Sequence, residues 1–167
     1  TGCKYLEAAP STGVNAWTDA AYVWSGNTNT LIGASAQGTA IGTGFANTLA
    51  IVGQSSGGET TNRAGTISRA YRGPNSLSDW YLPSQGELNQ MCKWQRGITG
   101  DNLTNLTTVC TGGTINTGAG APSFLPQIYW SSSEVGAEVA YFQSFIDGLQ
   151  YDYYKDFADY VRPVRAF

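Results

Sequence analysis

The chain has 167 residues, of which 41% are hydrophobic and 13% aromatic, and its net charge is −3. This length fits one domain with a sizeable core, so we expect a single domain over residues 1–167. The negative charge argues against nucleic acid as a partner, because phosphates call for an excess of Lys and Arg. No apolar run approaches the roughly 20 residues of a membrane helix, so no membrane insertion is expected.

The first 44 residues are rich in loops. YLEAAP (5–10) and AAYVW (20–24) are typical of short strands, and Trp17 and Trp24 are expected to pack onto the core. Glycines recur through residues 32–44, but the GK[ST] of a phosphate loop is missing, so we predict no nucleotide cofactor.

Helical spacing follows in two stretches. Residues 45–55 place Phe45, Leu49 and Val52 on one face, which predicts a helix that buries this face, with Thr43 or Gly44 as its cap and an exit at Gly53. Residues 63–73 predict a further helix with Ile67 and Tyr71 inward, which ends at Gly73-Pro74.

The clearest local pattern is DWYLPSQGELNQM (79–91). Trp80 to Leu82 predict a short buried strand, and Ser84 with Glu87 forms the pattern of a capping box. A helix is therefore predicted over residues 85–96, with Leu88, Met91, Cys92 and Gln95 on its inner face.

Residues 97–127 are dense in Gly, Thr and Asn and predict a polar surface loop. Asn102 and Asn105 begin N-glycosylation patterns, which matter only in a glycosylating secretory pathway. Cys92 and Cys110 bracket a polar segment and could close it as a disulfide; alternatively, they and Cys3 are buried thiols. The chain has no His and no CxxC, so no metal site is predicted.

The last stretch, residues 129–167, combines two kinds of sequence. Tyr129-Trp130 and VRPVRAF (161–167) have the character of scaffold, whereas residues 135–160 are crowded with Tyr, Phe and Asp. Asp147-Gly148 between two strand-like runs predicts a hairpin with a type I′ turn. Pro163 either marks an edge strand or ends its pairing. Period 2 does not decide whether Phe142, Ser144 and Ile146 or the alternating residues are buried.

Three segments together resemble a known family: IGTGFANTLAIV (41–52), DWYLPSQGELNQM (79–91), and YWSSSE with the terminal YVRPVRAF. Their order and spacing are similar to the C-type-lectin-fold domain of bacterial collagen-like adhesins and of variable proteins of diversity-generating retroelements. The resemblance implies an α+β fold in which two helices pack on a small, mostly antiparallel sheet, with a ligand surface on the late strands.

In such variable proteins, adenines are copied with errors, so that AAC codons become NNC codons, which exclude Lys, Glu, Gln, Met and Trp. Residues 135–160 contain no Asn, and their only residues of the excluded types are Glu138, Gln143, Gln150 and Lys155, which we interpret as fixed framework. The alternative is an ordinary aromatic hairpin without diversification.

We therefore predict a binding module rather than an enzyme, because without His only carboxylates could serve in acid–base chemistry and no facing pair is evident. The candidate ligand contacts are Tyr141, Tyr151, Asp152, Tyr153, Tyr154, Asp156, Phe157, Asp159 and Tyr160. Alternation along a strand predicts that about half of the tyrosines are buried scaffold. The expected partner is a macromolecule, protein or glycan, on another cell, met by a monomer on a cell or virion surface; the alternative is a carbohydrate-binding adhesin domain.

Overall fold

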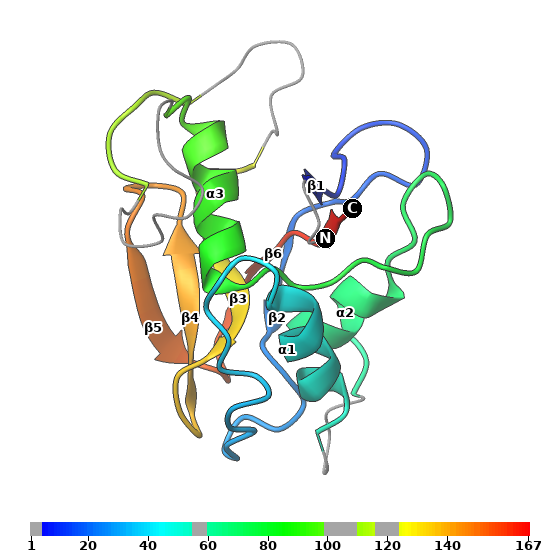
Figure 1. Cartoon of the computed structure of the whole chain (residues 1–167), viewed down its shortest axis with the longest axis vertical. Helices are drawn as coiled ribbons and strands as arrows, with labels where there is room; N and C mark the ends of the chain where they lie inside the picture. The colour runs from blue at the N-terminus through cyan, green and yellow to red at the C-terminus, as the bar shows by residue number, and fades with distance from the viewer. Residues whose placement is uncertain (1–4, 55–59, 99–109, 116–123) are drawn as a thin grey trace.

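The computed structural model describes residues 5–54, 60–98, 110–115 and 124–167 (Figure 1). Within these ranges the chain is an α+β protein with three helices and two sheets. Cys3 and the patterns at Asn102 and Asn105 lie outside the described residues, as does most of the predicted loop 97–127.

The larger sheet has five strands in the order β2-β6-β3-β4-β5. Its members are β2 (Ala20–Val23), β3 (Ile128–Glu134), β4 (Val139–Ser144), β5 (Gln150–Tyr154) and β6 (Ala158–Val161). All neighbours are antiparallel except β3 and β6. β1 (Leu6–Ala8) pairs with β7 (Val164–Ala166) in a separate two-stranded sheet. Pro163 stands between β6 and β7, so it ends the pairing in one sheet rather than marking an edge.

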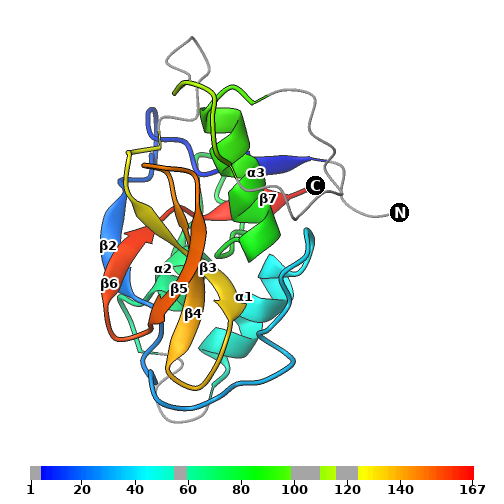
Figure 2. The same cartoon turned by 90° about the vertical axis from the view of Figure 1, so that its left-hand side faces the viewer.

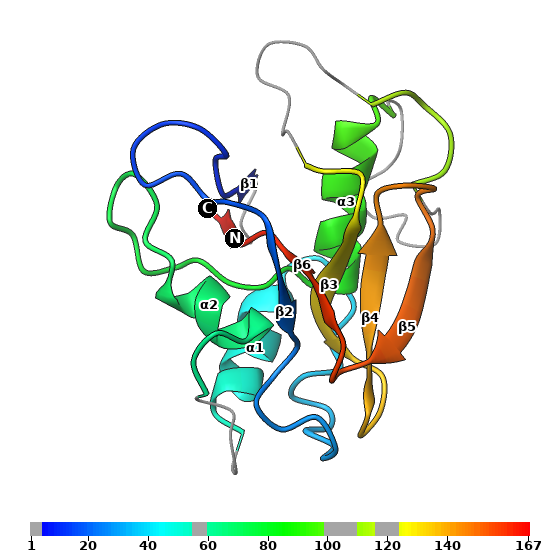
Figure 3. The same cartoon turned by 180° about the vertical axis from the view of Figure 1, so that it is seen from behind.

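The helices are α1 (Gly44–Val52), α2 (Ala64–Ala70) and α3 (Gln85–Gln95). The family resemblance implied two helices, and α2 is the additional one. α1 and α3 lie in front of the five-stranded sheet in Figure 1, and the opposite view shows its strands uncovered (Figure 3). The sheet therefore has one face toward α3 and one face that α3 does not cover.

The predicted inner face of α1 is wrong. Phe45 and Leu49 are exposed, whereas Asn47, Thr48 and Ile51 are buried. Asn47 donates to the Gly38 carbonyl at 2.6 Å, and Thr48 donates to Leu82 at 3.1 Å. Polar side chains face inward here because loop carbonyls are buried beside the helix and need donors. The periodicity of apolar residues could not indicate this.

α2 ends at Ala70 rather than at Gly73, and it packs through small residues. Ala64, Gly65 and Ser68 are buried, while Ile67 and Tyr71 are only partly buried against the core. A Cβ on Gly65 would lie 2.7 Å from Ile51, so the two helices approach each other closely at this glycine.

α3 confirms the capping box. Ser84 accepts from the Glu87 amide at 3.3 Å, and Glu87 accepts from the Ser84 amide at 2.8 Å. The four predicted inner residues of α3 are buried. The strand at Trp80 to Leu82 is reduced to one bridge, between Tyr81 and Val164, although all three residues are buried as predicted.

The expected core is confirmed, including Trp80, Leu82, Trp130, Val161 and Val164. Trp17 and Trp24 are also buried, and their indole N–H groups donate to Val161 and Ser131 carbonyls at 2.8 and 2.7 Å. β1 and β2 occupy the two predicted N-terminal strands.

The hairpin between β4 and β5 is confirmed, but the type I′ turn is wrong. Gly148 has φ +83°, whereas Asp147 does not have positive φ. The Ser144 amide donates to Leu149 at 2.9 Å and closes a longer loop. Phe145 within this loop is buried beside Tyr129 and Phe124, so core packing selects the longer connection.

Candidate functional site

β5 is the edge strand beside β4, and both of its faces are exposed. The exposed fractions are 48% for Tyr151, 41% for Tyr153 and 52% for Tyr154. The prediction that half of the tyrosines are buried is wrong for this strand. Alternation buries one set of side chains only where a second layer packs on that face of the sheet. Along β5, neither face is covered well enough to bury the tyrosines.

The pairing of β4 with β5 divides the candidate residues between two faces. Phe142 lies opposite Tyr151, and Ala140 lies opposite Tyr153, so these four side chains share one face of the sheet. Phe142 also lies opposite Trp130 of the core. This is the face that α3 does not cover, because Gln143 and Gln150, which alternate with these residues, are on the side of α3.

The aromatic rings on this face touch one another. The Phe142 ring centroid lies 5.7 Å from that of Tyr151 and 6.3 Å from that of Tyr153. Tyr153 in turn lies 4.6 Å from Phe157, which is 49% exposed. We call Phe142, Tyr151, Tyr153 and Phe157 the aromatic face. Phe142 is its buried floor, and the other three rings meet solvent.

The opposite face of the hairpin carries a second group. Tyr141 lies opposite Asp152, and Val139 lies opposite Tyr154. Asp152 and Tyr154 are exposed, and Tyr141 is partly buried. The predicted contacts therefore lie on two faces of one edge strand and not on a single plane.

Residues 155–157 connect β5 directly to β6, although β3 and β4 lie between these strands in the sheet. Figures 2 and 3 show the end of β5 and the start of β6 coming together at one end of the twisted sheet. Asp156 and Phe157 of this connection are both exposed. The connection therefore carries candidate contacts beside those of β5.

Lys155 anchors this connection. Its ammonium lies 2.6 Å from Glu134 Oε1 and 2.8 Å from the Ala137 carbonyl, and it sits 4.8 Å from the centre of the Trp24 ring. Its backbone amide donates to Glu138 at 2.8 Å. Burial lowers the pKa of Lys155, and the Glu134 carboxylate opposes that shift. Through these contacts, Lys155 binds the connection between β5 and β6 to the turn that joins β3 and β4.

Glu134 is itself held by backbone amides. Its carboxylate accepts from Ile32 at 3.0 Å and from Gly33 at 2.8 Å. Both charged side chains of the pair are fully buried. A buried charge needs both a partner and further hydrogen bonds, and Glu134 has both. Its function is therefore structural.

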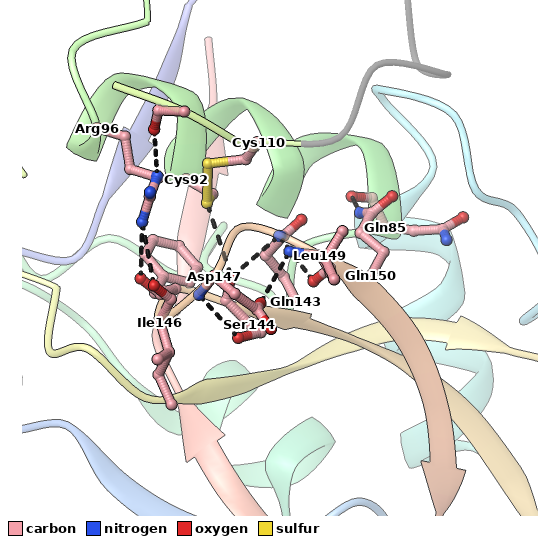
Figure 4. The surroundings of a disulfide bond; sticks show 12 residues. Gln85, Cys92, Arg96, Cys110, Gln143, Ser144, Ile146, Asp147, Leu149 and Gln150 are labelled. Carbon is pink, nitrogen blue, oxygen red and sulfur yellow. Dashed lines mark hydrogen bonds between the residues drawn. A yellow bond between two sulfur atoms is a disulfide. The ribbon is translucent and has the colours of Figure 1, made fainter. Parts of the chain in front are cut away.

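Two further residues of the predicted framework are held in place (Figure 4). Gln143 is fully buried, and its side-chain amide donates to Leu149 at 3.1 Å. The side-chain amide of Gln150 donates to the Gln85 carbonyl of α3 at 3.0 Å. Glu138 differs, since its side chain is exposed, and its backbone carbonyl accepts from the Lys155 amide.

Cys92 of α3 forms a disulfide with Cys110, which settles the choice that the sequence left open for these two residues. The turn between β4 and β5 packs against this bridge (Figure 4). The approach is so close that a Cβ on Gly148 would lie 2.9 Å from the Thr111 amide and overlap the Cys110 carbonyl.

Arg96, at the end of α3, also holds the turn, since it donates to Gly112 at 2.8 Å and to Ile146 at 3.3 Å. α3 and the disulfide therefore position the hairpin.

The β6 candidates, Asp159 and Tyr160, face opposite sides of the sheet. Tyr160 is partly buried, with its ring 5.8 Å from Tyr129, so it belongs more to the scaffold than to the surface.

Asp159 is partly buried opposite Tyr22 of β2. It alternates with Tyr160 and shares its face with Val161, which joins the core cluster of Trp130 and Phe142. Burial raises the pKa of Asp159 to about 6.

No family model matches the chain, and no curated protein matches it significantly. Within the described ranges, no helix is long and apolar enough to cross a membrane. No three His, Cys, Asp or Glu side chains gather into a metal-binding group there.

The sequence did not single out two features that shape this surface. One is Phe142, whose ring links the exposed tyrosines to Trp130 at 6.5 Å. The other is the buried network in which Arg162 and Tyr129 both bind Asp19, at 2.5 and 2.6 Å. Burial and Asp19 raise the pKa of Tyr129 well above its ordinary value. Only the three-dimensional structure brings Asp19 to residues more than a hundred positions away.

Proposed function

We propose that this chain is a non-catalytic, ligand-binding module with a C-type lectin fold, and that it is the variable protein of a diversity-generating retroelement. Residues 135–160 are its diversified surface. The observation that carries the proposal is that residues which NNC codons can encode and residues which they exclude occupy different environments. Side chains that NNC codons can encode occupy the exposed positions of β5 and its crossover. Three of the four residues that such codons exclude, Gln143, Gln150 and Lys155, are bound into the framework.

The surface has the chemistry of a recognition site. Tyrosine offers a large, rigid contact area and a hydroxyl at low entropic cost, which is why antibody loops are rich in it. Tyr151, Tyr153 and Tyr154 are each more than 40% exposed on a strand whose outer edge has no partner within the described residues. A framework of buried side chains holds this strand, so the exposed side chains can change without loss of the fold.

The buried acidic groups support a binding role rather than catalysis. The buried carboxylates are engaged in structure: Glu134 binds Lys155, Asp19 binds Arg162, and Glu87 caps α3. None of these three is at the exposed surface of residues 135–160. A reactive site needs groups that can reach a substrate.

The disulfide supports an extracellular location, on a cell or a virion, because such bonds persist mainly in oxidising compartments. The proposed ligand is a macromolecule presented by another cell. A carbohydrate-binding adhesin domain is the second candidate, since the exposed Tyr151 and Tyr153 rings could stack on a sugar while Asp156, next to Phe157, binds its hydroxyls.

The test compares two libraries that randomise five positions each with NNC codons, both displayed on yeast and sorted for resistance to protease. The exposed library changes Tyr151, Asp152, Tyr153, Tyr154 and Phe157. The matched buried library changes Ala140, Phe142, Gln143, Phe145 and Lys155. We expect most members of the exposed library to fold and most of the buried library to fail, because exposed substitutions usually change stability by less than about 0.5 kcal/mol.

The folded members of the exposed library are then sorted for binding to a biotinylated test protein. Binders whose affinity depends on the randomised positions are expected. Equal failure of both libraries would show that β5 is core, and folded members that never yield a binder would contradict a recognition surface. A glycan array probed with the wild-type chain tests the adhesin candidate.

A further inference from the structure

The surface of residues 135–160 has a strongly one-sided charge. It carries five carboxylates, on Glu138, Asp147, Asp152, Asp156 and Asp159, and a single cation, Lys155. Lys155 is buried and neutralised by Glu134. At the hairpin turn, a hydrogen bond with Ser144 lowers the pKa of Asp147, and the charge of Arg96 contributes in the same direction. The other four carboxylates have no ion pair with any described residue, so an incoming ligand meets negative charge without an accessible cation beside it.

Two of these carboxylates, on Asp156 and Asp159, belong to the side of the aromatic face. Asp156 directly precedes Phe157, whereas Asp152 alternates with Tyr151 and Tyr153 and so lies on the opposite face of the sheet. Asp159 shares its sheet face with Phe142, the floor of the cluster. Tyr153 and Phe157, with ring centroids 4.6 Å apart, form the most closely packed pair of exposed rings there. The surface therefore combines exposed π-systems with carboxylates that form no ion pair with a described residue.

At three other places, one of the chain's own basic side chains lies over an aromatic ring and binds a carboxylate. Lys155 lies over Trp24 and binds Glu134. The Arg162 guanidinium lies 4.6 Å from the Phe124 ring centre and binds Asp19. Arg165 lies 4.7 Å from the Phe167 ring centre and binds Glu7 at 2.9 Å. A cation over a ring and beside a carboxylate is favourable in each contact. At the aromatic face of β5, no described basic side chain lies over the rings.

We propose that the ligand is a protein that places an arginine or lysine side chain on the aromatic face, between the Tyr153–Phe157 ring pair and the flanking carboxylates. This inference rests on the proposed function and names its ligand class. An aromatic ring attracts a guanidinium or ammonium group through its quadrupole, and the carboxylates add charge complementarity and steer the encounter. A polyanionic glycan is repelled by the same charges, and a neutral glycan leaves them without partners.

The test pans a displayed library of random dodecapeptides against the immobilised full chain and three variants. The aromatic variant carries Tyr151→Ser, Tyr153→Ser and Phe157→Ser. The acid variant carries Asp156→Asn and Asp159→Asn, which keeps side-chain shape and removes charge. The control variant carries Ile41→Ser, Phe45→Ser and Leu49→Ser, which removes comparably exposed apolar side chains at α1. Melting temperatures establish that each variant is folded before panning.

We expect the wild type and the control variant to recover peptides enriched in Arg and Lys, the acid variant to lose that enrichment, and the aromatic variant to recover none of them. In the best peptide, replacing one arginine by citrulline should weaken binding by about threefold or more, as expected for one cation–π contact. Recovery of neutral or acidic peptides that depend on Tyr153 and Phe157 would overturn this inference and leave the proposed function intact. Recovery unaffected by the aromatic substitutions, or no recovery at all, would contradict both.

Discussion

The Lys155 ammonium lies 2.6 Å from a carboxylate oxygen of Glu134, and both side chains are fully buried. This pair joins the crossover after β5 to the end of β3, and so it holds the exposed strand at a fixed place on the sheet. Two residues inside and beside the candidate surface thereby act as its support.

Lys155→Met should destabilise the fold by about 3–5 kcal/mol, because it leaves the Glu134 carboxylate buried without its counter-charge. Adding Glu134→Gln should restore part of this loss, since glutamine still accepts from the Ile32 and Gly33 amides and carries no charge. Urea unfolding of both single variants and the double variant measures the coupling. Strictly additive losses would show that the pair contributes no interaction energy.

Gly148→Ala should destabilise the hairpin by more than its backbone conformation alone explains. At φ +83°, a side chain costs roughly 1–2 kcal/mol, and the new Cβ would also overlap the Cys110 carbonyl, which adds about 1–3 kcal/mol of overpacking. Gly42→Ala is the matched control, because Gly42 has φ +91° and open space around it. The difference between the two unfolding free energies isolates the contact with the disulfide; equal values would refute that contact.

Replacing both Cys92 and Cys110 by serine should lower the free energy of unfolding by about 3 kcal/mol, because the bridge restrains the unfolded chain across a separation of 18 residues. Unfolding midpoints of the double variant and of reduced wild-type protein should coincide. Thiol labelling provides the independent check, and a native protein in which both cysteines react before reduction would rule out the bridge.

Asp159→Asn should change how stability depends on pH. Burial raises the pKa of Asp159 from 3.8 to about 6 in the folded protein. The folded state therefore binds this proton more tightly than the unfolded state, and the resulting stabilisation is complete below pH 4 and is lost as the pH rises toward 6. The variant cannot ionise, so its melting temperature relative to wild type should increase between pH 4 and pH 7. A difference that does not vary with pH would show that Asp159 is not desolvated.

The elements fixed by local chemistry could be predicted from the sequence. Ser84 and Glu87 are three positions apart and complete their hydrogen bonds within one helical turn, so α3 and its cap follow from a short segment. Trp80, Leu82 and Trp130 are large and apolar, and burial removes most of their surface from water wherever the chain closes around them.

The tertiary structure decided which side of each element is buried. α1 turns Phe45 outward because Asn47 and Thr48 bind loop carbonyls that only folding brings beside them. Tyr151 and Tyr153 have the alternation of a half-buried strand but are exposed, because β5 is at the edge of the sheet. Lys155 is a charged residue in a polar segment, yet it is fully buried, because Glu134 and Trp24 meet it from distant parts of the chain. Periodicity and capping act over a few residues, whereas burial depends on partners that the sequence alone does not place.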